Sequence, residues 1–286
     1  MTRRAPIIGW GAILGAALAA SFASLPVQLG FAVLAIGVIG MAHGASDLAI
    51  VEDRRKRLFL ILYAAVSAAC LLWWVLFPAV ALPLFLMASA VHFGLEDAPS
   101  SAPVERALRG IALVAAPAAL HQAELHDLLT SAGGSPSSSM AAIRIMAAAG
   151  GVAAAGLLVL AIHRSDRQLA IGTMSLLILP PLVGFSVGFL ILHAAPQTVA
   201  RQRQIGCESV AAYVRQVAPL MAGAILIVAV IGAVVLRQEV SGVRSLFAAV
   251  AALAIPHLLV TPLFERSLAD DHSVTHHGRP LASVGG

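Results

Sequence analysis

Long apolar runs separated by short polar connections dominate the chain. A helix needs roughly 17–25 predominantly apolar residues to cross the hydrocarbon core of a bilayer, and most of the runs have about that length. They cover residues 6–24, 28–50, 58–76, 79–97, 107–126, 140–162, 168–182, 184–200, 217–236 and 244–264. Membrane barrel strands would show short segments of alternating polarity instead. The pattern predicts an all-α fold: a polytopic membrane helical bundle with 10 transmembrane segments.

The seventh and eighth runs meet at "LPPLVGFSVG" (179–188), whose two prolines could simply kink one long helix. Basic residues favour two segments, because Lys and Arg gather in cytoplasmic loops. With a cytoplasmic N-terminus, ten crossings leave only Arg144, Arg237 and Arg244 at outer ends, whereas nine would export "RQRQ" (201–204). We therefore expect ten segments, or eight full helices plus a broken pair, with both termini in the cytoplasm.

Composition supports the membrane assignment. Hydrophobic residues make up 59% of the 286 residues and charged residues 11%, with a mean hydropathy of +0.92. Soluble domains usually carry about 25% charged residues. The pI of about 9.8 reflects basic helix ends, so it does not indicate nucleic-acid binding. Two cysteines provide neither a disulfide framework nor a CxxC motif.

The domain organisation follows from the same pattern. Residues 1–266 are expected to form a single transmembrane helical domain, with the first apolar run retained as a helix although "MTRR" precedes it. Residues 267–286 have the composition of a disordered tail, and its three histidines are not expected to be ligands.

Four histidines lie inside apolar runs, where polar residues are costly and usually functional. They are His43, His92, His193 and His257, and all four occur in even-numbered runs. Each precedes the cytoplasmic end of its run by two turns or fewer, which at 1.5 Å per residue places them at a similar depth, roughly 8–15 Å below the inner face. This common depth predicts one shared metal site; the alternative is four separate structural histidines that bond to neighbouring helices.

A polar residue follows each of these histidines four positions later, on the same helix face. These residues are Asp47, Glu96, Gln197 and Thr261. Ligating histidines commonly donate their second ring N–H to such a group, which fixes the orientation of the ring. We expect the four residues to support the imidazoles rather than bind metal. Neutral imidazoles suit zinc, copper, iron or nickel; ferrous iron with O2 suits a site with open positions, and zinc stays possible.

Four stretches of the chain resemble the Brp/Blh family of bacterial β-carotene 15,15'-dioxygenases. They are "HGASDL" (43–48), "HFGLED" (92–97), the helix around His193, and "PHLLV" (256–260). The resemblance implies an enzyme of the bacterial cell membrane that binds Fe2+ through histidines. It also implies cleavage of the carotenoid with O2 into two molecules of retinal, which serves microbial rhodopsins. Members usually have two histidines one turn apart in the third motif, whereas this chain has Gln197 at the second position.

The expected substrate site is an apolar cleft between the even-numbered helices, open to lipid. Trp74, Phe93, Phe185 and Phe189 are the candidate wall residues. A divergent family member acting on another apolar substrate is one alternative. A metal or ion transporter that uses the intramembrane histidines is another. A di-iron hydroxylase or desaturase would need HxxxH-type clusters, which the membrane runs lack. The sequence does not indicate whether the protein forms oligomers.

Overall fold

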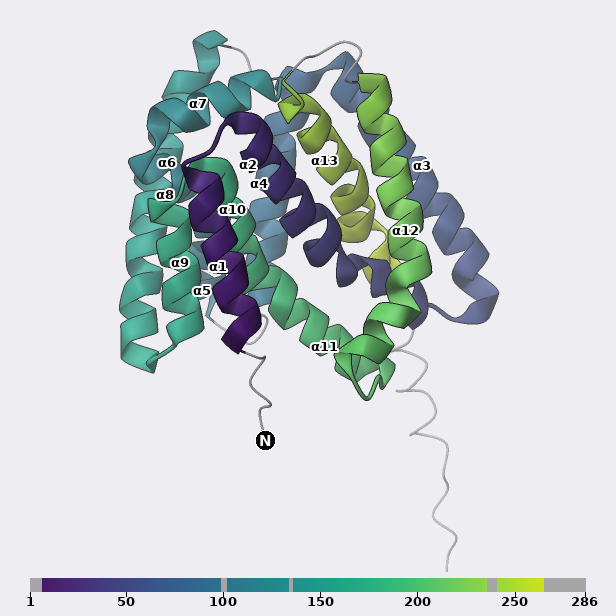
Figure 1. The fold of residues 1–286 in the computed structure, drawn as a ribbon. Coiled ribbons are helices and arrows are strands. Elements are labelled where there is room, and N and C mark those ends of the chain that lie inside the picture. Colours follow the sequence, from purple (N-terminus) through teal and green to yellow (C-terminus); the bar gives the residue numbers. More distant parts are fainter. Residues whose placement is uncertain (1–6, 99–101, 134–135, 236–240, 265–286) are drawn as a thin grey trace, which may run out of the picture.

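The protein is a bundle of packed helices, and the described residues contain no strand (Figure 1). The computed structural model describes residues 7–98, 102–133, 136–235 and 241–264. The expected tail, residues 267–286, lies outside this part of the chain. The α-helices are α1 Ile7–Ser21, α2 Leu25–Ala32, α3 Lys56–Leu76, α4 Pro78–Asp97, α5 Pro103–Ala115, α6 Pro117–Leu120, α7 Gln122–Ser131, α8 Pro136–Arg164, α9 Arg167–Ile178, α10 Pro181–Phe189, α11 Ala195–Ile205, α12 Val210–Val235 and α13 Val243–Leu259.

Five short helical segments of other geometry interrupt this series. Two are π-helical, η1 Val33–Ile39 and η5 Leu190–Ala194. Three are 3₁₀-helical, η2 Gly40–Ala42, η3 Gly44–Ile50 and η4 Asp53–Arg55. Proline occupies one of the first two positions of several α-helices, among them α4, α5 and α10. At the first turn its missing N–H costs nothing, because that N–H has no partner inside the helix.

Seven helical stretches in the described residues are long and apolar enough to cross a membrane. They are Leu25–Ile50, Asp53–Leu76, Pro78–Asp97, Met140–Arg164, Pro181–Ile205, Val210–Ile227 and Val243–Phe264. An all-α polytopic membrane bundle is therefore confirmed, with fewer full-length spans than the ten runs suggested. The remaining runs correspond to shorter helices, of which α1 and α9 are two.

The run 107–126 is the clearest difference from the sequence interpretation. Instead of one helix it forms α5, the single turn α6, and α7, which lies across one end of the bundle (Figure 1). Pro117 begins α6, and His121 leaves helical geometry with φ −128° and ψ 49°. Two consecutive breaks of this kind prevent a continuous span.

The chain reverses direction at Leu179 and Pro180, so the seventh and eighth runs are two helices and not one bent helix. Gly184 approaches the carbonyl of Ser175, and further along Gln168 donates a hydrogen bond to the carbonyl of Ile191 at 2.6 Å. Later residues of one helix thus meet earlier residues of the other, as in an antiparallel hairpin. Asp166 caps the start of α9 by accepting a hydrogen bond from the N–H of Leu169 at 3.0 Å.

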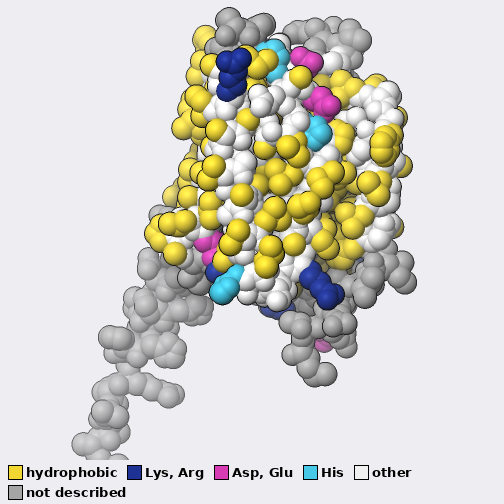
Figure 2. Space-filling view, turned by 90° about the vertical axis from the view of Figure 1, so that its left-hand side faces the viewer, with side chains coloured by type: hydrophobic (Ala, Val, Ile, Leu, Met, Phe, Trp, Pro, Cys, Tyr) yellow, Lys and Arg dark blue, Asp and Glu magenta, His cyan; other side chains and the backbone are white. Residues whose placement is uncertain are grey.

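The outer surface is apolar between two polar ends. Large side chains such as Ile162 and Val152 are 78% and 71% exposed. Figure 2 shows one face, on which hydrophobic side chains fill the middle while Lys, Arg, Asp, Glu and His gather toward the ends. A broad apolar surface of this kind is stable in lipid but not in water.

Glycines at the contact between α4 and α5 let these two helices approach closely. A Cβ at Gly110 of α5 would overlap the backbone carbonyl of Ala90 in α4. One at Gly94 of α4 would lie 2.5 Å from the carbonyl oxygen of Arg106 in α5. Small residues at such contacts are typical of membrane helix packing, where dispersion forces need close approach. The α4–α5 contact holds the α4 end that carries His92 and Glu96.

Gly110→Val should destabilise the bundle. The new side chain meets backbone, which cannot rotate aside, and overpacking costs about 1–3 kcal/mol or more. Thermal unfolding in detergent should show a lower midpoint than wild type. Gly223→Ala on α12 is the matched control, because a Cβ there meets nothing within 4 Å. Equal midpoints for the two variants would contradict the close-contact interpretation.

Candidate metal centre

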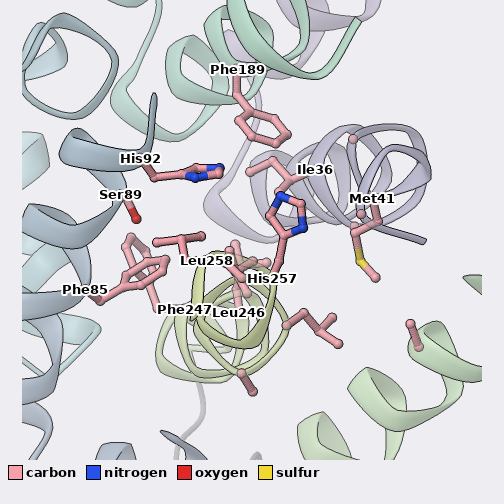
Figure 3. A pocket seen from close by; sticks show the side chains of 18 of the residues that line it. Ile36, Met41, Phe85, Ser89, His92, Phe189, Leu246, Phe247, His257 and Leu258 are labelled. Carbon is pink, nitrogen blue, oxygen red and sulfur yellow. The ribbon is translucent and has the colours of Figure 1, made fainter. Parts of the chain in front are cut away.

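The four membrane histidines meet at one point in the bundle, although they come from four separate segments. His92 lies on α4, His193 on η5, His257 on α13, and His43 between η2 and η3. The ring centroid of His43 is 4.9 Å from that of His193 and 5.5 Å from that of His257. The ring centroid of His92 is 5.4 Å from that of His193 and 5.3 Å from that of His257. His92 and His257 face the same space in Figure 3. A shared depth was predicted, and the rings do meet.

Irregular helix geometry positions two of these rings. His193 belongs to the π-helical segment η5, and His43 follows the π-helical segment η1 and the 3₁₀ turn η2. Such departures from the α-helix often occur at functional sites, because they re-aim side chains. Helix α10 also continues through η5 and α11 to Ile205, well past His193. The distance of His193 from a helix end, which was used to estimate depth, is therefore not two turns.

Three of the imidazoles are fixed through Nδ1. The Nδ1 atom of His43 bonds to the carbonyl of Gly40 at 2.5 Å, that of His193 to Asp97 Oδ1 at 2.9 Å, and that of His257 to Asp47 Oδ2 at 2.5 Å. Since carbonyl and carboxylate oxygens only accept, each Nδ1 carries the proton, and each Nε2 keeps a lone pair free for a metal. The Nε2 atom of His257 is buried and has no hydrogen-bond partner in the described part of the chain. This donor set fits a divalent metal ion.

Asp47 and Thr261 make different contacts from those expected of residues four positions after a histidine. Asp47 hydrogen-bonds to a histidine of another helix and not to His43: its Oδ2 accepts bonds from His257 and, at 2.7 Å, from Thr261. Residues 44–50 are 3₁₀-helical with about three residues per turn, so position i+4 lies about 120° away from position i. Thr261 thus supports Asp47 rather than His257.

Gln197 also differs from the expected arrangement, whereas Glu96 contacts the histidine on its own helix. The amide of Gln197 donates to the backbone carbonyl of Glu96 at 3.2 Å and reaches Asp97 Oδ1 at 3.5 Å. It supports the carboxylate behind His193 instead of the ring itself. The Glu96 carboxylate does contact the histidine on its own helix, with 3.5 Å between Oε2 and His92 Nε2.

Two supporting residues escaped the sequence interpretation. Asp97 follows Glu96 in "HFGLED" and is five positions from His92, so the i+4 pattern passed over it. Its partner, His193, is 96 positions away. Arg201 of α11 lies with its Nη2 atom 3.8 Å from Asp47 Oδ1. Both contacts join different helices, and no spacing along one helix could have indicated them.

An apolar cavity of about 570 Å³ opens beside the histidines. Its volume lies within the roughly 300–1,000 Å³ typical of ligand pockets. Side chains of α3, α4, α10, α12, α13 and η1–η3 line most of it. Figure 3 shows Phe85, Ser89 and Phe247 on one side of His257, and Met41 on the other.

Three of the four predicted wall aromatics line this cavity. They are Phe93, Phe185 and Phe189. The rings of Phe93 and Phe189 pack against His193 at 4.8 and 5.3 Å between centroids. Phe189 also lies against Gly40, where a Cβ would overlap its ring, so glycine is needed for this close approach. Trp74 does not line the cavity: it is fully buried behind Phe85, with 5.9 Å between the ring centroids, and Phe85 itself lines the cavity.

Asp97→Ala should weaken metal binding at the histidine centre. His193 would lose the acceptor that fixes its ring, and loss of such a partner typically lowers metal affinity about 10–100-fold. Titration of the purified protein with a divalent metal ion measures the effect. Asp127→Ala is the matched control, because Asp127 contacts His126 at 3.3 Å outside the centre. Equal metal affinity for Asp97→Ala and wild type would exclude this role.

Among the comparisons with known proteins, one family model matches the chain. Curated proteins and solved structures give no match. A family model described as "Beta-carotene 15,15'-dioxygenase" matches residues 34–265, which include all four histidines and the residues that line the cavity. The match covers well over half of the chain and agrees with the resemblance seen in the four motifs. The chain therefore belongs to the β-carotene 15,15'-dioxygenase family.

Proposed function

We propose that the protein is an iron-dependent membrane dioxygenase that cleaves β-carotene with O2 at the central double bond to give retinal. The observation that carries the proposal is the convergence of four imidazoles, three of them fixed through Nδ1, beside an apolar cavity. Family membership supports a dioxygenase acting on a carotenoid. His43, His92, His193 and His257 are the proposed residues of the Fe2+ site.

The proposed role of each residue follows from the chemistry of the substrate. Ferrous iron held by nitrogen and oxygen ligands with an open position is the usual means by which non-haem enzymes activate O2. Asp47, Asp97 and the Gly40 carbonyl hold the imidazoles in orientation. The polyene has no ionisable group, so no side chain has to donate or remove a proton. One O2 supplies the oxygen atoms of both aldehydes, and the reaction balances without another reductant.

The cavity's task is to place an uncharged chain and to exclude water. Its lining is largely hydrocarbon, which favours an apolar substrate by removing it from water or lipid headgroups. Because lining side chains lie on both sides of His257, the substrate can extend past the centre in two directions. A central double bond would then lie at the histidines while each half of the molecule occupies one side. Phe93, Phe185 and Phe189 are the proposed aromatic contacts.

We also propose that the protein resides in the bacterial cell membrane with both termini in the cytoplasm. Arg164 at the end of α8 pairs with Glu105 at the start of α5, at 2.9 Å. Nearby, Arg106 donates to the carbonyl of Ala98 at the end of α4, at 3.0 Å. These basic residues thus gather at one end of the bundle, as the positive-inside rule requires of the cytoplasmic side.

Expression in β-carotene-producing bacteria should yield retinal, detectable by chromatography. Product should form only with air, disappear when an iron chelator is added to purified protein, and return with Fe2+. His193→Ala should abolish it, whereas Glu124→Gln, on α7, should not. An iron-loaded wild-type protein that makes no retinal would instead indicate a family member acting on another apolar substrate.

Reporter fusions test the orientation. A cytoplasmic reporter placed after Arg203 or after Arg266 should be active in both cases, because the positive-inside rule places both positions on the side of the N-terminus. The matched fusion after Arg144 should report the opposite side. A periplasmic signal after Arg203 would contradict the proposed topology.

A further inference from the structure

The carboxylates around the histidines fall into two groups according to which ring nitrogen they face. Asp47 and Asp97 bind Nδ1 atoms, at 2.5 and 2.9 Å, and so lie behind their imidazoles. Glu96 faces Nε2 atoms: Oε2 is 3.5 Å from that of His92, and Oε1 is 4.0 Å from that of His257. Because Nε2 is the nitrogen left free for a metal, Glu96 lies on the inner side of the ring cluster.

The distances among possible ligand atoms also place Glu96 close to the histidine nitrogens. One ligand atom each from His92, Glu96 and His193 can be chosen so that all lie within 4.8 Å of one another. Metal bonds of about 2.0–2.2 Å place two ligand atoms of one ion up to about 4 Å apart, so small side-chain movements suffice. The buried, unpartnered Nε2 atom of His257 faces the same carboxylate. The hydrogen bonds that Asp47 and Asp97 make to histidines in the described part of the chain are both to Nδ1 atoms.

The position of Glu96 on the backbone also permits this role. It follows His92 by one turn of the regular helix α4, which keeps positions i and i+4 on one face. Its side chain is 31% exposed and that of His92 is 11% exposed, so the pair lies at the polar edge of the centre. Gln197 holds the Glu96 backbone carbonyl and leaves the carboxylate available.

We propose, on the basis of the function above, that Glu96 is itself a metal ligand, so that the centre combines histidines with one carboxylate. His92, Glu96 and His193 form two imidazoles and one carboxylate, the set that many ferrous oxygenases use. A negative ligand also offsets part of the charge of a divalent ion that apolar helices surround. This revises the expectation that Glu96 only orients a ring.

Cobalt(II) provides a test that does not depend on activity, because its visible absorption reports the identity and number of its ligands. Purified wild type, Glu96→Gln, Glu96→Asp and Glu124→Gln are each titrated with Co2+ in detergent. Glu124 is the matched control, since it too faces a nearby histidine, with 3.3 Å to His121 Nδ1, but lies on α7, away from the centre. Equal thermal midpoints of the variants establish that all are folded.

Glu96→Gln should bind Co2+ more than about 100-fold more weakly, a loss beyond the roughly 10–100-fold range of a supporting contact, and its absorption bands should shift. Glu96→Asp should recover part of the affinity and the wild-type bands, because it keeps the carboxylate. Glu124→Gln should match wild type. Unchanged bands and affinity in Glu96→Gln would overturn the proposal, as would a folded wild type that binds no Co2+. A Glu96-dependent Co2+ spectrum without any retinal formation would support the ligand and refute only the proposed reaction.

Discussion

The buried hydrogen bond between Asp47 and His257 is the contact on which the centre most depends. It joins side chains 210 positions apart, and both residues are less than a tenth exposed. Removing one partner of such a buried pair commonly costs about 3–5 kcal/mol, because the other is left without compensation. Thr261 and Arg201 reach the same carboxylate. The bond therefore fixes the segment η3 against α13, and with it the distance between His43 and His257.

Polar and apolar surroundings are separated within the same small region. Carboxylates, Gln197 and Arg201 surround the histidines toward one end of the bundle, whereas phenylalanines and aliphatic side chains line the cavity on the other side. The imidazoles lie at the boundary between the two. The cavity can then hold an apolar molecule by burial alone, while the imidazoles beside it are oriented by hydrogen bonds that the apolar surroundings strengthen.

Departures from regular helix geometry are part of this arrangement. His43 and His193 lie at 3₁₀ and π segments, and Pro256 precedes His257 within α13. Each departure changes the direction of a side chain relative to an unbroken α-helix. The packing of Phe189 against Gly40 and of Phe93 against His193 then holds these directions. The centre is thus built by irregular backbone that regular, closely packed helices support.

The sequence by itself determined the all-α membrane fold, because apolar length and the distribution of basic residues reflect the bilayer directly. It also identified the four histidines, since a polar residue within an apolar run needs a reason. Only the tertiary structure decided how those histidines are supported. Asp97 meets His193, and Asp47 meets His257, across different helices, whereas the i+4 spacing describes contacts within one regular helix. The same limit applies to Trp74, whose apolar character predicted burial but not whether it would line the cavity or lie behind Phe85. Periodicity along a chain records the face of a helix, and the neighbours of that face are set by how the helices pack.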